Sequence, residues 1–267
     1  MKGMTELYTV KDVYEAMDII APFKNLDKGD NSTLVVGDYG DKVTKVLITL
    51  DITVDAVEEA KAKGAELIVS HHPVIYYPLY KLSDKSPACL ALKYGVACIC
   101  SHSPLDMADG GINDILYDMF KEPFGLSEEK EVLEVIHSDG RGYGMVCDMG
   151  REFTPAELAK TAKEILGCTA VRYTNGRNIK RLAFCSGGGG KNIEPAVKMG
   201  ADALITGDVK HDQLITAKNA GVTIVDCGHY HTETVAVPYL KKRLEKILPD
   251  IDFIIAESNT DPACYII

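Results

Sequence analysis

Short apolar runs alternate along the chain with longer segments in which apolar residues recur every three or four positions. Residues 10–20 have the period of an amphipathic helix, whereas the run at 45–50 has the length and composition of a buried strand. A helix over residues 154–166 is expected to begin with Thr154 as its cap and Pro155 in its first position. The further predicted helices cover residues 53–63, 86–94, 113–120 and 234–247. The further predicted strands cover residues 33–37, 67–69, 96–100, 132–137, 144–148 and 253–256.

One strand–helix–strand pattern occurs twice. Residues 45–70 reappear without a gap as residues 181–206, at a constant offset of 136. The first copy runs directly into a histidine pair, and the second into a glycine and an aspartate. A further strand-like segment follows each copy and leads to another histidine, His102 in the first half and His229 in the second. Potential ligands therefore follow matching strands in two related halves, as expected when a duplicated fold builds one shared site.

Repeated β-α-β units joined by short turns favour an α/β fold with mixed sheets covered by helices. Because the pattern is duplicated, we predict two related α/β domains. The charged, turn-rich stretch at 121–130 is the best candidate for the boundary between them. We therefore assign residues 1–125 to the first domain and 126–267 to the second.

Composition limits the classes of protein that the chain can represent. Its 267 residues are 46% hydrophobic, which is enough for two modest cores, and its net charge is −10. The chain has no Lys/Arg-rich run, so a broad nucleic-acid surface is not expected, although a small cationic pocket stays possible. It also has no signal-peptide pattern near Met1 and no apolar stretch of membrane-spanning length. We expect a cytoplasmic protein.

The eight cysteines show no C-x-x-C spacing of the kind found in zinc or redox sites. Cys98 lies within a strand-like apolar run, where a thiol behaves as a small hydrophobic residue. We predict that most of the cysteines are core residues in a reducing compartment.

Histidines and carboxylates cluster after the predicted strands, where the sheets of α/β proteins collect ligands. His71 and His72 follow the strand at 67–69, and they can converge only if the chain bends before Pro73. His229 and Glu233 are four residues apart, the spacing that places side chains on one helical face.

Together with Asp106, these side chains offer three imidazoles and two carboxylates. That mixture suits Zn, Mn, Fe or Co better than Ca or Mg, and a bridging carboxylate can hold two ions. The residues therefore predict a metal site, and a dinuclear one is possible with this donor set. His137, His211 and His231 lack motif support as ligands, and we expect them to be peripheral.

Several motifs occur in order along the chain. They are Ser70-His71-His72-Pro73, Ser101-His102-Ser103-Pro104-Leu105-Asp106 with Gly110-Gly111-Ile112-Asn113-Asp114, Thr206-Gly207-Asp208 and Gly228-His229-Tyr230-His231-Thr232-Glu233. With these motifs the chain resembles the GTP cyclohydrolase I type 2 homologue family, also called the NIF-three-like proteins. The resemblance covers nearly the whole chain, and Asp30-Asn31 and Gly37 agree with it.

This resemblance implies a two-domain α/β protein with a dinuclear metal site at the domain interface, assembled as a ring-shaped homohexamer. Its ligands, carried over by motif, are His71, His72, Asp106, His229 and Glu233, and Glu233 is expected to bridge the ions. His102 becomes a neighbour of the site and the candidate catalytic residue.

Two departures from the family pattern stand out. Longer members carry an inserted domain, and the segment at 121–178 is too short to hold one, so this chain is the compact form. Ser103-Pro104 precedes Leu105-Asp106 where the family often has a hydroxyl or amide residue before Leu-Asp, and we expect at most a slight change of the loop that leaves Asp106 in place.

The family name implies hydrolysis of a nucleotide, with ring opening of GTP and release of formate. A metal-dependent phosphoesterase and a non-enzymatic metal-binding scaffold would use the same ligands, and both alternatives stay open. The loop Gly187-Gly188-Gly189-Gly190 has two interpretations as well, a phosphate cradle or a tight strand-to-helix turn. The acid-rich segment 106–114 does not have the register of an EF-hand.

Overall fold

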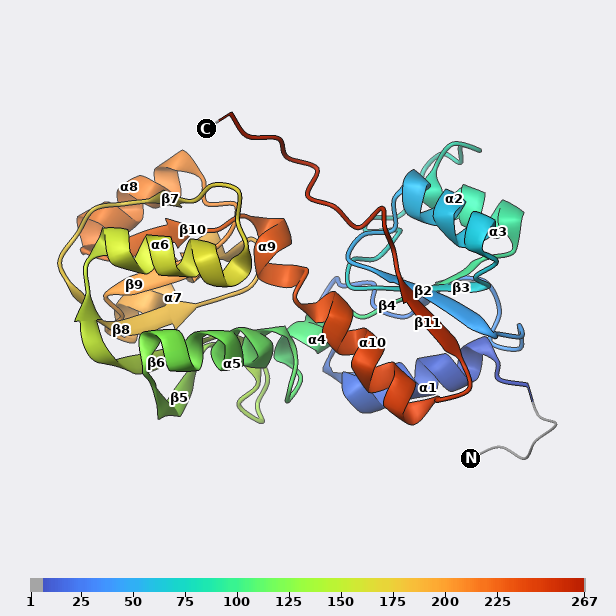
Figure 1. Cartoon of the computed structure of the whole chain (residues 1–267), viewed down its shortest axis with the longest axis horizontal. Helices are drawn as coiled ribbons and strands as arrows, with labels where there is room; N and C mark the ends of the chain where they lie inside the picture. The colour runs from blue at the N-terminus through green and yellow to red at the C-terminus, as the bar shows by residue number, and fades with distance from the viewer. Residues whose placement is uncertain (1–6, 267) are drawn as a thin grey trace. The chain divides into compact units, whose positions relative to one another are not determined.

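The computed structural model describes residues 7–266, which fold into two compact units (Figure 1). The described part of Met1–Ala108 forms the first unit together with Ala236–Thr260. Asp109–Val235 forms the second unit together with the described part of Asp261–Ile267. The chain therefore returns to the first unit after completing most of the second.

This division differs from the single boundary that we predicted between residues 125 and 126. Helix α5 (Ile112–Phe124) belongs to the second unit, because Phe120 and Phe124 lie in that unit's core. Strand β11 (Asp252–Ile255) belongs to the first unit, because it pairs in parallel with β2 (Lys45–Thr49). Local composition does not indicate to which unit either element belongs. Helix α5 is placed by side-chain packing and β11 by strand pairing, and both involve residues far apart in the sequence.

The sheet of the first unit has the strand order β1-β4-β3-β2-β11. Strand β1 is antiparallel to its neighbour β4, and the other neighbouring pairs are parallel, so the sheet is mixed. The strands introduced here are β1 (Leu34–Val36), β3 (Leu67–Ser70) and β4 (Ala97–Cys100).

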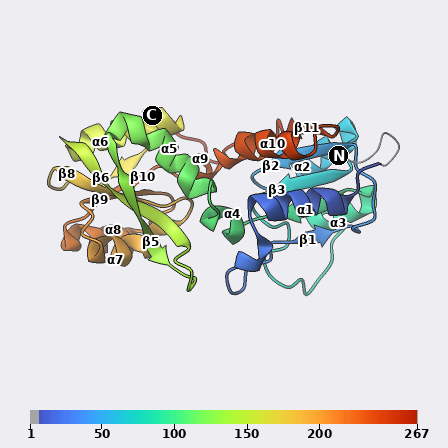
Figure 2. The ribbon, with the colours of Figure 1, turned by 90° about the horizontal axis from the view of Figure 1, so that it is seen from below.

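Helices cover both faces of this sheet. The first layer contains α1 and α10, and the opposite layer contains α2 and α3 (Figures 1 and 2). Leu47, Ile68 and Cys98 pack toward α2 and α3 in one apolar cluster. The bounds are α1 (Val10–Ile20), a 3₁₀ turn η1 (Phe23–Asn25), α2 (Val54–Lys63), α3 (Pro87–Tyr94), α4 (Ser103–Met107) and α10 (Ala236–Ile247).

The sheet of the second unit has the strand order β5-β6-β8-β9-β10-β7. Strands β8, β9 and β10 are parallel to one another, whereas β5, β6 and β7 each run antiparallel to a neighbour. Their bounds are β5 (Leu126–Val135), β6 (Gly142–Phe153), β7 (Arg172–Tyr173), β8 (Ile179–Phe184), β9 (Ala203–Thr206) and β10 (Thr223–Asp226).

Two helical layers sandwich this second sheet as well. Helices α5 and α6 lie on one face, and α7 and α8 lie on the other (Figure 2). Leu182 faces the first layer and Ala183 the second, as the alternation of strand side chains requires. The remaining bounds are α6 (Pro155–Leu166), a 3₁₀ turn η2 (Gly189–Asn192), α7 (Ile193–Lys198), α8 (His211–Ala220) and α9 (His229–Glu233).

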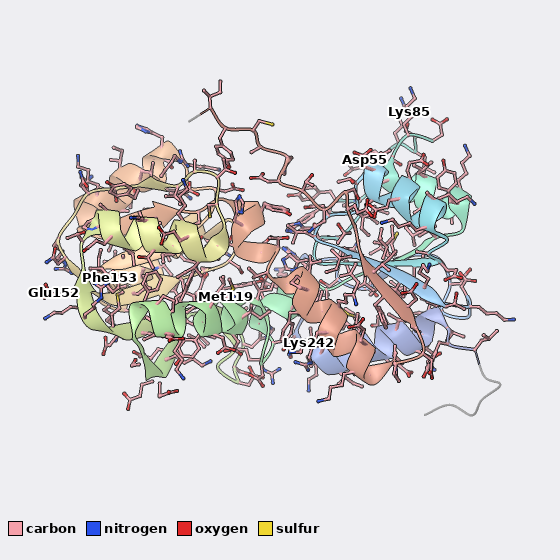
Figure 3. All side chains as sticks on the ribbon, in the orientation of Figure 1. Asp55, Lys85, Met119, Glu152, Phe153 and Lys242 are labelled. Atoms are coloured by element: carbon pink, nitrogen blue, oxygen red, sulfur yellow. The ribbon has the colours of Figure 1, made fainter. Side chains whose placement is uncertain are left out.

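Apolar side chains lie between the sheets and the helices, and most charged side chains lie on the outer surface (Figure 3). Phe153 is buried against Phe124 in the core of the second unit, with ring centroids 5.4 Å apart. Charged residues such as Asp55, Lys85 and Lys242 are exposed. Each sheet therefore has an apolar interior on both faces, the arrangement typical of parallel strands covered by helices.

The duplication is visible in the sheets. The strand order β1-β4-β3-β2 of the first unit matches β7-β10-β9-β8 of the second, with three parallel strands and one antiparallel edge in each. A side-chain contact is duplicated too: Glu66 accepts hydrogen bonds from the backbone of Thr44 and Lys45. Asp202 accepts them in the same way from residues 180 and 181. This confirms the predicted pair of related α/β units with mixed sheets.

Most predicted elements are confirmed, including the capped helix at Thr154. The stretch 121–130 is an exception, because α5 continues to Phe124 and β5 begins at Leu126 after the left-handed Gly125. Helices α4, α8 and α9 and the short strand β7 were not among the predicted elements. No helix within residues 7–266 has both the length and the apolar character that a membrane span requires.

The cysteines are core residues for the most part, as predicted. Six of the eight are buried, and none of the eight forms a disulfide bond within residues 7–266. Burial raises the pKa of both Cys98 and Cys100 to about 12, so these two side chains stay protonated at neutral pH.

Replacing Glu66 with glutamine tests the duplicated contact. Burial alone would raise the pKa of Glu66, but hydrogen bonds from Lys45 and Thr44 outweigh it, so the pKa lies below its ordinary 4.5. The stabilisation is therefore present above that value and is lost as the pH falls through the folded-state pKa. We expect Glu66→Gln to lower the free energy of unfolding by about 1 kcal/mol at pH 7.

Urea denaturation at neutral and acid pH measures this effect. The difference between Glu66→Gln and wild type should shrink as the medium becomes acidic. The exposed Glu129 provides a matched control, and Glu129→Gln should unfold as wild type does. Equal stability of both variants at neutral pH would contradict the assignment.

Candidate metal-ligand sets

In the first unit, the chain bends directly after β3 and brings two adjacent histidines together. The Ser70 hydroxyl donates to the carbonyl oxygen of His72 at 2.7 Å, and the His72 N–H donates to the Leu50 carbonyl at 3.0 Å. The imidazole centroids of His71 and His72 are 4.8 Å apart. The bend that we predicted before Pro73 is therefore present.

Oxygen atoms fix both of these imidazoles through Nδ1. His71, which is fully buried, places Nδ1 3.1 Å from the Ser101 carbonyl oxygen. His72 places Nδ1 2.8 Å from Asp51 Oδ1. Because these oxygens only accept, Nδ1 carries the proton in each neutral ring and Nε2 keeps a lone pair. Asp51 had no signal in the sequence analysis.

His102 completes a group of three imidazoles whose nitrogens lie within 4.8 Å of one another. Its Nδ1 lies 3.3 Å from Asp30 Oδ1, and the hydroxyl of Tyr76 lies 3.2 Å from its Nε2. Burial lowers the pKa of His102, but the Asp30 hydrogen bond and the charges of Asp106 and Asp30 outweigh it, so the pKa is raised. Asp30 matched the family pattern, and the structure gives it this contact.

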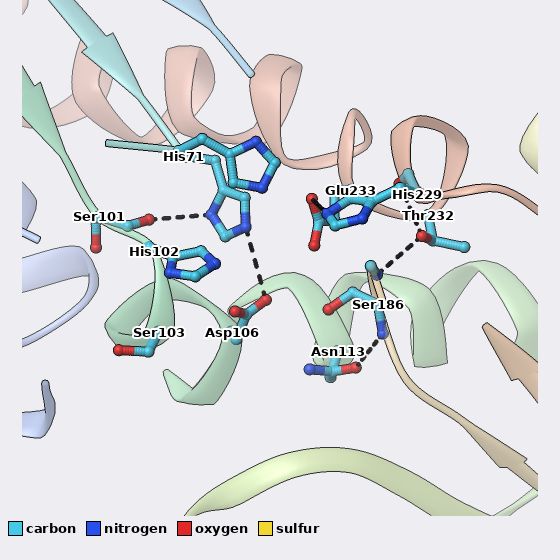
Figure 4. A network of polar contacts seen from close by, with 12 residues as sticks. His71, Ser101, His102, Ser103, Asp106, Asn113, Ser186, His229, Thr232 and Glu233 are labelled. Atoms are coloured by element: carbon cyan, nitrogen blue, oxygen red, sulfur yellow. Dashed lines mark hydrogen bonds and ion pairs between the residues drawn. The ribbon is translucent and has the colours of Figure 1, made fainter. Parts of the chain in front are cut away.

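Asp106 lies on α4, which is separated from β4 by two residues. Its Oδ1 is 3.9 Å from His71 Nε2, and the residue is 8% exposed (Figure 4). Pro104 occupies the first turn of α4, where a missing N–H costs nothing. The departure from the family pattern at Pro104 therefore leaves the aspartate in place, as expected.

In the second unit, His229 and Glu233 lie one turn apart on α9. His229 Nε2 is 2.9 Å from Glu233 Oε2, and Glu233 is 3% exposed (Figure 4). His229 Nδ1 is 2.8 Å from Asp208 Oδ2. Asp208 adopts a φ of 53°, a left-handed conformation that aspartate tolerates better than most residues. The predicted helical spacing of the pair is confirmed, and Asp208 gains an orienting contact.

The loop after β8 packs against the same carboxylate. The Gly187 N–H donates to Thr232 Oγ1 at 3.0 Å, and the Gly189 N–H donates to Thr206 Oγ1 at 2.9 Å. The Ser186 N–H donates to the side chain of Asn113 (Figure 4). Since these donors are engaged within the protein, the tight-turn interpretation of the glycine run is favoured over the phosphate cradle.

Helices α4 and α9 are equivalent parts of the duplication. Each is five residues long and is separated by two residues from the corresponding strand, β4 or β10. Each carries a buried carboxylate, Asp106 in the first unit and Glu233 in the second. The two ligand sets are thus built on one backbone plan.

The remaining histidines lie elsewhere. His231 pairs with Asp261 at 3.3 Å, and His211 is an exposed residue at the start of α8. Neither of them nor His137 belongs to a metal-ligating group among residues 7–266. That they are peripheral to the site stays a prediction.

The fold and the site define a class of protein. It is a duplicated α/β protein that carries imidazole and carboxylate side chains after matching strands of its two units. The model of the family Duf34/NIF3 (NGG1p interacting factor 3) matches residues 8–262. The chain belongs to this family, which confirms the predicted resemblance.

Relatives that match over most of their own length support the assignment. The "GTP cyclohydrolase 1 type 2 homolog" of Clostridium perfringens is 31% identical, over 95% of this chain and 98% of that protein. The protein of the same name from Lactococcus lactis is 36% identical, over 76% of this chain and 79% of its own. A crystal structure of a Staphylococcus aureus hypothetical protein superposes with a TM-score of 0.86 at 27% identity, covering 98% of this chain and 100% of that one.

Gly187 provides a test of the packing around Glu233. A Cβ at this position would lie 2.0 Å from Glu233 Oε1, and the backbone has a φ of +59°. We expect Gly187→Ala to reduce the free energy of unfolding by about 1–3 kcal/mol, measured by urea denaturation. Gly188→Ala is the matched control, because its Cβ would meet His229 only at an ordinary 3.9 Å. Equal stability of the two variants would contradict the close approach.

Proposed function

We propose that the protein binds two divalent metal ions at one site formed by His71, His72, Asp106, His229 and Glu233. The observation that carries this proposal is the anchoring of three imidazoles through Nδ1 to oxygen acceptors. Metal-binding histidines characteristically have such partners, which orient Nε2 toward the ion.

The chemistry of the donors fits such a site. Two imidazoles and a carboxylate in the first unit are too few for two ions, and one imidazole and one carboxylate in the second are fewer still. We therefore infer that the two sets join at the interface of the units, with Glu233 as the bridge. The donor types suit Zn, Mn, Fe or Co.

We further propose that this site hydrolyses a nucleotide, with ring opening of GTP as the leading reaction. The support is the name "GTP cyclohydrolase 1 type 2 homolog" carried by the bacterial relatives. Two bound ions would supply a water molecule of lowered pKa. Asp30 orients His102 through Nδ1, and His102 Nε2, which lies 3.2 Å from the Tyr76 hydroxyl, would accept a proton from the reacting group.

Two alternatives use the same ligands. A phosphoesterase would release phosphate from its substrate, and a non-enzymatic scaffold would bind metal without turnover. A yeast relative, 27% identical over 82% of this chain, is named "NGG1-interacting factor 3", which gives the scaffold its support.

A cytoplasmic location and a homohexameric ring also belong to the proposal.

Turnover measurements distinguish these functions. Protein reconstituted separately with Zn, Mn and Fe should convert GTP to formate and a ring-opened product, and Glu233→Ala should abolish the reaction. Phosphate release from a nucleotide panel would favour the phosphoesterase. Absence of any turnover by the metal-loaded protein would overturn the hydrolase proposal and favour the scaffold.

Metal content tests the ligands independently of the substrate. We expect wild-type protein to hold two ions per chain by elemental mass spectrometry, and His72→Ala and Glu233→Ala to lose bound metal while remaining folded. His211→Ala is the control, since this exposed residue lies outside the proposed set. Full occupancy in both ligand variants would defeat the assignment.

The residues that orient the imidazoles should affect affinity without abolishing binding. We expect Asp51→Asn and Asp208→Asn to weaken metal binding by about 10- to 100-fold, because an amide holds the ring less firmly than a carboxylate. Competition against a chelator of known affinity measures the change. Wild-type affinity in both variants would show that these carboxylates do not support the ligands.

A further inference from the structure

The loop that follows the histidine pair exposes aromatic side chains beside His102. Residues 73–80 contain no charged side chain, and three of the eight are tyrosines. Tyr76 is 46% exposed and Tyr77 is 77% exposed. Exposed rings at such a position leave apolar surface in water next to the proposed reaction site, which is typical of a ligand-binding surface.

The base of this loop is firmly held. Val74 and Ile75 pack against the apolar cluster beneath α2 and α3. The side-chain amide of Asn31 donates to the carbonyl oxygen of Ile75 at 2.8 Å. Because Asn31 adjoins Asp30, the same segment supports both the loop and His102. The first exposed ring therefore starts from a fixed backbone position.

Contacts with His102 then orient Tyr76. Its hydroxyl lies 3.3 Å from Nδ1 and 3.2 Å from Nε2 of His102, and the two ring centroids are 5.5 Å apart. The ring of Tyr77 lies 5.7 Å from that of Tyr76. The polar end of Tyr76 is thus engaged, while part of its ring and most of Tyr77 stay accessible.

We propose that Tyr76 and Tyr77 bind a planar heteroaromatic ring of the substrate by stacking and place it beside His102. This inference rests on the proposed function, because it takes the His102 neighbourhood as the reaction site. Tyrosine faces accept any flat ring, so the platform selects for a nucleobase-like group without reading its identity. A purine or a pyrimidine satisfies this chemistry, and a sugar phosphate without a base does not.

The absence of tryptophan from the chain permits a direct test. Tyr77→Trp introduces a single indole, and its fluorescence should be quenched to saturation by guanosine, uridine and GTP but not by ribose 5-phosphate. Tyr80→Trp is the matched control, because Tyr80 is fully exposed in the same loop and has no ring contact with His102 among the described residues. Its indole should respond to none of the four compounds.

Quenching in Tyr80→Trp equal to that in Tyr77→Trp would overturn the proposal, since it would indicate non-specific contact with the loop. Lack of quenching by every base-containing compound would overturn it as well. Quenching without any GTP turnover would support the platform and reject only the GTP reaction, so the two failures can be distinguished.

Calorimetric titration of guanosine provides a second measurement. Tyr76→Leu removes the ring and should weaken binding by about 5- to 150-fold, the loss expected for one stacked base. Tyr76→Phe keeps the ring and should bind with near wild-type affinity. Both variants should retain wild-type metal content, which confirms that the ligand set is intact. Equal affinity of Tyr76→Leu and wild type would contradict a stacking role.

Discussion

The Nδ1 atom of each proposed ligand histidine faces an oxygen atom, and this contact decides how the imidazole presents its other nitrogen. A backbone carbonyl serves His71, and carboxylates serve His72 and His229. Each acceptor fixes the proton of the neutral ring on Nδ1, so that Nε2 presents its lone pair toward the neighbouring side chains. Without these acceptors the rings could rotate and present either nitrogen. The orientation of the ligands therefore depends on residues that are not ligands themselves.

Duplication explains where those supporting residues come from. Both units place a loop after one strand, β3 or β9, and a five-residue helix after the next strand along the chain, β4 or β10. In the first unit the loop carries His72, whereas the corresponding loop of the second unit carries Asp208, which orients His229. The helices carry Asp106 and Glu233 at similar depths of burial. The same loop position thus supplies a proposed ligand, His72, in one unit and a residue that orients a proposed ligand, Asp208, in the other.

Much of this arrangement could be predicted from the sequence, because it depends on local patterns. Strand length, helical spacing and the offset of 136 located the repeats, and the spacing of His229 and Glu233 identified a helical pair. The contact of Asp51 with His72 was not predictable from the sequence. It joins the segments that follow two neighbouring strands, β2 and β3, and the two residues share no motif. The unit boundary was missed for the same reason, because β11 finds its place only by pairing with β2.

The central claim is that ligands from both units hold two ions at one site. X-ray absorption spectroscopy of the Mn- or Zn-reconstituted protein tests it most directly. The account predicts a metal–metal vector of about 3.5–4 Å and a first shell of mixed imidazole nitrogen and carboxylate oxygen. It also predicts that this vector disappears in Glu233→Ala. A spectrum without a second metal, unchanged by that substitution, would contradict the shared dinuclear site.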